Sequence, residues 1–174
     1  MSVISSAAQR EVVALLDSNG NIHAAWIDRD DLSAQGRASL WYSTYDPEAP
    51  RSATARLVDR SASIDSLDMI VDDLDNIHIV WVRQTSDPGS LNATDSNTRA
   101  RGIYYHRILS DGTSLLSPKL LLESRTEPLC ASVTSEHNDR LYVAWIENQR
   151  MDSGDTESNT YYGTHGTLAS PRLR

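Results

Sequence analysis

The sequence predicts an all-β protein of three repeats, each one blade of a β-propeller. A short apolar segment that contains a tryptophan occurs three times, at 21–27, 76–82 and 140–146. Each copy follows an apolar run closed by an acidic turn and precedes a pair of aromatic residues. The tryptophans lie about 60 residues apart, a period that suits one propeller blade of four strands and a variable loop.

The tryptophan segments are predicted to be buried strands. Each is short, rich in Ile, Val and Trp, and bounded by Asn, Asp or Gly, which favours a strand over a helix. In the copy at 76–82, apolar residues occupy both faces of the strand. A strand of this kind is covered on both sides by other sheets. We therefore expect Trp26, Trp81 and Trp145 to occupy equivalent buried positions.

Four strands can be placed in each blade, numbered from the centre of the propeller outward. The first strands are predicted near 12–16, 67–71 and 131–134. The second contain the tryptophans, and the third contain the aromatic pairs at 41–42, 104–105 and 161–162. The fourth are predicted near 53–59 and 118–123. Segments rich in Asp and Asn at 17–21, 72–76 and 136–140 predict tight hairpin turns between first and second strands.

The repeats span about 3–57, 58–121 and 122–174 and form a single three-blade unit. In repeat register, the first residues match the second half of a fourth strand, and residues 170–174 match its first half. Closed propellers have roughly four to eight blades, and an arc of three leaves two apolar faces open. We therefore expect two chains to close a six-bladed ring as a homodimer, or the chain to belong to a longer propeller.

The composition excludes some classes of partner. Hydrophobic residues make up 39% of the chain, and no apolar run is long enough for a membrane-spanning helix. The net charge of −8 argues against nucleic acid, whose binding proteins display basic surface. The single cysteine, Cys130, is expected to be a small buried residue of an inner strand. An extracellular or cell-surface location is the expectation, although the sequence leaves the compartment open.

Three motifs carry a family resemblance. They are Asp-x-Asn-Gly-Asn-Ile-His-x-x-Trp at 17–26, Ile-Tyr-Tyr followed by Ser-Asp-Gly at 103–112, and Ser-Pro-x-Leu at 117–120. Over essentially the whole chain, the repeats resemble the blades of sialidase-type, BNR-like six-bladed β-propellers. The family's Asp-box, Ser-x-Asp-x-Gly-x-Thr-Trp, is only echoed at 110–113, without its spacing or its tryptophan. The resemblance therefore implies the propeller fold more than it implies sialidase chemistry.

For an enzyme, the resemblance implies an arginine triad, a tyrosine nucleophile paired with a glutamate, and an aspartate acid/base. The Arg-Ile-Pro signature of the family is absent, and no residue has a motif context that assigns it a catalytic role. We therefore predict no catalytic residues and a non-catalytic binding or scaffold module, with a glycan or a protein as ligand. A sialidase-like glycoside hydrolase is the alternative, and a structural module without a ligand is a third interpretation.

Two sets of residues in the hairpin turns could be mistaken for metal ligands. Asp17, Asn19 and Asn21 alternate as in calcium loops, and the acidic residues at 72–75 cluster similarly. Asp and Asn also stabilise tight turns by hydrogen bonding to their own backbone. An EF-hand loop that begins at Asp17 would place Ile22 where it needs glycine. We therefore predict turns here, with neither a metal nor a cofactor.

The loops between second and third strands are the predicted ligand-binding region. They are the longest and most variable segments, at 28–38, 84–101 and 148–158, and they emerge on the same face as the loops between blades. Binding residues concentrate on such loops over a rigid scaffold. The residues predicted to contact a ligand are Asp30, Asp31, Arg37, Arg99, Arg101, Arg150, Asp152 and Asp155. Recurrent Tyr42, Tyr105 and Tyr162, by contrast, are expected to pack, and His23 and His78 to be buried with polar tips.

Overall fold

The structure is a computed structural model that describes residues 11–30, 37–49, 55–61, 63–84, 101–114, 117–124, 127–136, 140–150 and 156–161. These residues form three antiparallel sheets. The first contains β1 (Glu11–Leu16), β2 (Ile22–Asp30), β3 (Arg37–Tyr45) and β4 (Arg56–Ser61). The second contains β5 (Ile64–Val71), β6 (Ile77–Gln84), β7 (Arg101–Ile108) and β8 (Lys119–Ser124). The third contains β9 (Glu127–Glu136), β10 (Arg140–Arg150) and β11 (Thr156–Tyr161).

Each sheet is an antiparallel meander in which the strands lie in chain order, as in a propeller blade. The predicted all-β propeller architecture is confirmed, with four strands in each of the first two blades. The half-strands predicted at both ends of the chain lie outside the described residues. Within the described ranges, no helix is long and apolar enough to span a membrane.

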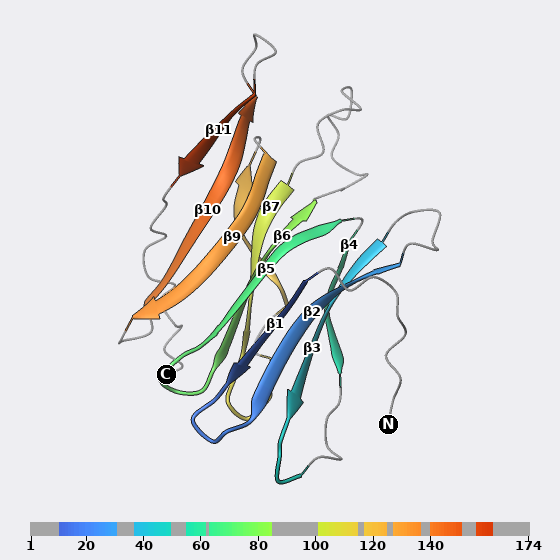
Figure 1. The fold of residues 1–174 in the computed structure, drawn as a ribbon, viewed down its shortest axis with the longest axis vertical. Coiled ribbons are helices and arrows are strands. Elements are labelled where there is room, and N and C mark those ends of the chain that lie inside the picture. Colours follow the sequence, from blue (N-terminus) through green and yellow to red (C-terminus); the bar gives the residue numbers. More distant parts are fainter. Residues whose placement is uncertain are drawn as a thin grey trace.

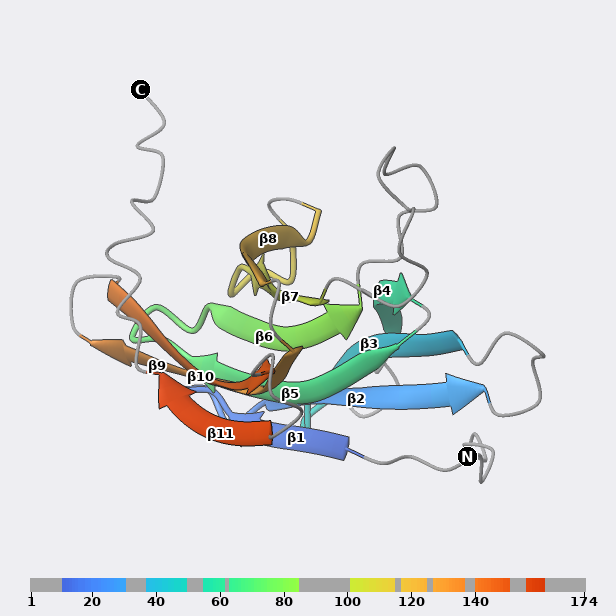
Figure 2. The same ribbon diagram turned by 90° about the horizontal axis from the view of Figure 1, so that it is seen from above.

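The three sheets are arranged one after another through their first strands. Strand β5 lies between β1 and β9, and the sheets follow one another from β9–β11 to β1–β4 (Figures 1 and 2). The loops between second and third strands begin at the ends of β2, β6 and β10. Because β2, β6 and β10 share one direction relative to their inner strands, these loops emerge at one end of the sheets, which we call the loop end. The hairpins that join first and second strands lie at the opposite end, the hairpin end.

Two apolar layers hold the sheets together. Between the first and second sheets, Ile27 and Leu40 pack in one cluster with Ile79 and Trp81. Between the second and third sheets, Val80 and Val82 of β6 pack with residues of β9 and β10. Strand β6 is therefore buried on both faces, as the sequence predicts, and it is the best-covered strand among the described residues.

The three tryptophans share a register but not a degree of burial. Trp26 pairs with Val12, Trp81 with Leu67, and Trp145 with Ala131, the same place in each blade. Only Trp81 is fully buried, because the first sheet covers it. Trp145 is partly buried against the second sheet. The expectation of equal burial was wrong for Trp145 and for Trp26, which points away from the second sheet.

The expectation of a buried Cys130 was also wrong, because its side chain is exposed. In β9, Ala131 and Val133 point toward the second sheet and are buried there. Successive side chains of a strand point to opposite faces, so Cys130 lies on the outward face of the third sheet.

Replacement of Trp81 by alanine is expected to destabilise the chain strongly. The substitution leaves a cavity between two sheets and should lower the free energy of unfolding by about 3–5 kcal/mol. Urea unfolding followed by circular dichroism measures the change. Leu74→Ala is the matched control, since the side chain of Leu74 is 61% exposed in a turn. Equal unfolding midpoints for the two variants would contradict the assignment of Trp81 to the core.

Candidate functional site

A cluster of charged side chains lies at the loop end, between the first two blades. Asp65, at the start of β5, accepts hydrogen bonds from Arg29 Nη2 at 2.9 Å and from Ser63 Oγ at 2.7 Å. Arg29 Nη2 also donates to the Ile64 carbonyl oxygen at 3.0 Å. Arg101 Nη2 lies 3.7 Å from Asp65 Oδ2. We call Arg29, Ser63, Asp65 and Arg101 the Asp65 cluster.

The Asp65 cluster carries an excess of positive charge in an acidic chain, because two guanidinium groups share one carboxylate. The side chains of Arg29, Asp65 and Arg101 are between 24% and 28% exposed, so they are neither buried nor fully solvated. Arg101 lies beyond hydrogen-bond distance of Asp65, and its planar group of N–H donors can turn toward an anion. The cluster is therefore suited to binding an acidic group.

A second ion pair, between Asp59 of β4 and Arg83 of β6, joins the first two sheets. Arg83 Nη1 donates to both oxygens of Asp59, at 2.8 and 3.0 Å. Trp81 Nε1 donates to Asp59 Oδ2 at 2.9 Å. The guanidinium of Arg83 lies 4.2 Å above the ring of Tyr104. Because Asp59 is buried and its oxygens are occupied, this pair stabilises the blade interface and offers no carboxylate to a ligand.

The structure shows where some of the residues predicted to bind a ligand lie. Arg101 belongs to the Asp65 cluster. The backbones of Asp30 and Arg37 are opposite each other at the loop end of β2 and β3. Arg150 is the last residue of β10, at the same end. The side chains of these three residues lie outside the described part of the structure, as do Asp31, Arg99, Asp152 and Asp155 entirely.

Sequence reasoning missed Arg29, Ser63 and Asp65. Their signal was present but general: Arg29 lies in the predicted loop at 28–38, and Ser63 and Asp65 lie in the loop predicted between the first two blades, at 61–65. Nothing in the one-dimensional pattern pairs residues 36 positions apart, as Arg29 and Asp65 are. Their proximity depends on the packing of β2 beside β5.

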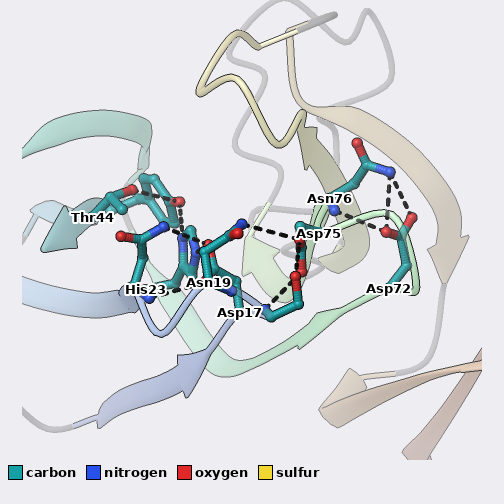
Figure 3. A network of polar contacts seen from close by, with 10 residues as sticks. Asp17, Asn19, His23, Thr44, Asp72, Asp75 and Asn76 are labelled. Carbon is teal, nitrogen blue, oxygen red and sulfur yellow. Dashed lines mark hydrogen bonds and ion pairs between the residues drawn. The ribbon is translucent and has the colours of Figure 1, made fainter. Parts of the chain in front are cut away.

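At the hairpin end, Asp17 organises the turn between β1 and β2. Its Oδ1 accepts hydrogen bonds from the backbone N–H groups of Asn19 and Asn21, at 2.9 and 2.8 Å. Its Oδ2 lies 3.2 Å from His23 Nε2. His23 Nδ1 shares a hydrogen bond of 2.6 Å with Tyr42 Oη (Figure 3). Both His23 and Tyr42 are buried, which confirms their predicted packing role.

The second blade repeats this arrangement. His78 Nε2 lies 2.9 Å from Asp72 Oδ2, and His78 Nδ1 lies 2.8 Å from Tyr105 Oη. The third blade uses a shorter version, in which Tyr142 Oη donates to Glu136 at 2.6 Å. The Asp-His-Tyr chain therefore recurs in the first two blades, where it links the hairpin turn to the second and third strands.

The two hairpin turns also bind each other. The backbone N–H and the hydroxyl of Ser18 donate to the carboxylate of Asp75, at 2.9 and 2.5 Å (Figure 3). Asp75 has a left-handed backbone with φ of 60°, and Gly20 has φ of 83°. These turns are stabilised by N–H donors around each carboxylate, which confirms the hairpin interpretation of both segments. The described residues contain no group of three or more His, Cys, Asp or Glu side chains that could hold a metal ion.

The hydrogen bonds of the turns change the acidity of their carboxyl groups. Burial alone raises the pKa of Asp72, but hydrogen bonds from His78 and Asn76 outweigh it and lower the pKa below the ordinary 3.8. For Asp17, burial likewise raises the pKa, and hydrogen bonds from Asn21 and His23 bring it below 3.8. Both groups are therefore held as carboxylates in the folded chain.

Comparisons with known proteins concern the fold. No protein-family profile and no curated protein matches the sequence. Among solved structures, the chain is similar to an endo-arabinase from Bacteroides thetaiotaomicron VPI-5482, with 12% identity and a TM-score of 0.49 over 90% of this chain and 57% of that one. It is also similar to the Cellvibrio cellulosa α-L-arabinanase complexed with arabinohexaose, with 8% identity and a TM-score of 0.38 over 84% and 55%. The chain thus spans little more than half the length of each.

The lowered pKa values of Asp17 and Asp72 predict that the fold loses stability in acid. A carboxyl group with a lowered pKa in the folded state stabilises the fold fully above its unfolded pKa, and this contribution disappears as the pH falls through the folded pKa. We expect the free energy of unfolding of the native chain to fall as the pH drops below about 4.

The Asp72→Asn variant should show a weaker fall, together with a loss of about 1–3 kcal/mol near neutral pH from broken buried hydrogen bonds. Urea unfolding at several pH values measures both effects. Glu48→Gln, an exposed change in the loop after β3, serves as control. A pH profile for Asp72→Asn parallel to that of the native chain would contradict the role given to Asp72.

Proposed function

We propose that this chain is a non-catalytic binding module of propeller type, whose ligand is a glycan or a protein that carries acidic groups. The Asp65 cluster is the observation that supports the proposal. It lies at the loop end, where binding residues concentrate on propeller-like scaffolds. Its two arginines bring more positive charge than Asp65 neutralises, and Arg101 is positioned to exchange a loose ion pair for a ligand's carboxylate or sulfate.

The alternative, a sialidase-like glycoside hydrolase, requires different groups at the same place. A hydrolase of this type uses a tyrosine nucleophile paired with a glutamate, together with an aspartate acid/base, so it needs carboxyl groups that can exchange a proton within the site. Near the loop end, Asp65 accepts hydrogen bonds from Arg29 and Ser63. Asp59 accepts them from Arg83, from Trp81 and from the backbone N–H of Arg60. Both carboxylates are bound to arginines and position their guanidinium groups. These two carboxylates therefore favour binding over hydrolysis.

A binding and turnover experiment separates the two functions. The chain is titrated with sialylated, uronic-acid and sulfated oligosaccharides, with arabino-oligosaccharides as neutral probes, and each mixture is analysed for cleavage. We expect binding of an acidic probe without cleavage. Arg101→Gln should weaken that binding about tenfold or more, because a charge-assisted hydrogen bond contributes about 1.5–3 kcal/mol.

Lys119→Gln is the matched control, since it removes a positive charge at the hairpin end of β8 and should leave binding unchanged. Cleavage that disappears when a single loop-end carboxylate is replaced would establish the hydrolase instead. Absence of both binding and cleavage for every probe would overturn the glycan as ligand and leave an acidic protein or a structural module.

A further inference from the structure

The outward face of the first sheet is apolar, although no described sheet covers it. Its side chains form rows across the strands, because paired residues of an antiparallel sheet share a face. One row contains Val12, Trp26, Trp41 and Leu57. Leu16, 66% exposed, lies in a parallel row with Ile22. We call these six residues the open face.

The open face corresponds to a surface that is buried elsewhere in the same chain. In the second sheet, the row that matches Val12 and Trp26 is made by Leu67, Trp81 and Tyr104. The first sheet covers that row, and all three of its residues are buried. Val12, by contrast, is 64% exposed. The open face therefore has the composition and register of a blade interface that lacks its neighbour.

A face that could cover the open face is present on the third sheet. In the first sheet, the residues that cover the second sheet include Leu15, Ala25 and Ile27. In the third sheet, the equivalent residues are Thr134, Ala144 and Ile146, as the pairing within β9 and β10 shows. They point away from the second sheet. Because the second sheet lies between the first and the third, these two faces do not meet within one chain (Figure 1).

We propose that the open face of the first blade is a docking surface for the third blade of a second copy of this chain, so that two chains close a ring of six blades. The ring continues the interface that already joins the described blades, and its blade number lies within the range of closed propellers. The same contact occurs twice around a two-fold axis, so no apolar blade face stays open. This inference is independent of the proposed ligand.

The contact between β1 and β5 predicts which residues lie side by side where two chains meet. Where the first blade meets the second, Glu11 Oε1 accepts a hydrogen bond from the Leu67 N–H at 2.8 Å. Val12 is the counterpart of Leu67, because both pair with the tryptophan of their blade. Cys130 is the counterpart of Glu11, because each pairs with the isoleucine that follows the tryptophan. In the closed ring, Cys130 of the partner subunit therefore lies beside Val12.

A cysteine cross-link tests this arrangement. The Val12→Cys variant is oxidised mildly and analysed on non-reducing gels, where we expect nearly complete conversion to a covalent dimer of twice the 19.3 kDa chain mass. The product should revert on reduction and be absent from the double variant with Cys130→Ser. Leu74→Cys places an equally exposed thiol on a turn, away from the open face, and should cross-link at least tenfold more slowly.

Sedimentation of the unmodified chain gives a second measurement that does not depend on any substitution. We expect a dimer at micromolar concentration, and Leu16→Glu should raise its dissociation constant at least tenfold while circular dichroism shows an intact β fold. A folded monomer in sedimentation would overturn the proposal. So would equal cross-linking of Leu74→Cys, or a ladder of larger oligomers from Val12→Cys, which indicates an open filament instead of a closed ring.

Discussion

The packing of one sheet on the next is the constraint on which the rest of this structure depends. Strand β6 carries large apolar side chains on both faces, and it is buried only because a sheet lies on each side of it. A blade of this composition cannot stand alone in water, since burial of its faces is the main favourable term in its folding. Each blade therefore requires neighbouring blades, and each sequence repeat supplies the apolar faces that pack on them.

Polar contacts between inner strands give these apolar interfaces a single register. Apolar packing is non-directional and would tolerate sliding of one sheet over another. The hydrogen bond from the Ala131 N–H to Ser66 Oγ, at 3.0 Å, and the one from the Val133 N–H to Asp68, at 2.9 Å, hold β9 against β5. Ser66 adopts a left-handed backbone at a bulge in β5, which directs its hydroxyl across the blade boundary.

The two ends of the sheets use charge differently. At the hairpin end, the carboxylates of Asp17 and Asp72 are surrounded by N–H donors and buried, so they stabilise turns. At the loop end, the ion pair between Asp65 and Arg101 is loose and partly exposed. The hairpin carboxylates therefore contribute to stability, whereas the partly exposed ion pair of Asp65 and Arg101 contributes little, because such pairs are screened by water.

The sequence by itself determined the local structure of this protein. Alternating and continuous apolar runs predicted the strands, Asp and Asn predicted the hairpins, and the recurrence of tryptophan predicted the blades, because these features depend on residues close in the chain. Only the tertiary structure decided what depends on neighbouring sheets: that Trp81 is fully buried while Trp26 is only partly buried, that Cys130 is exposed, and that Arg29 contacts Asp65. Residues with the same local pattern differ in these respects because burial and ion pairing are set by what lies across the blade boundary.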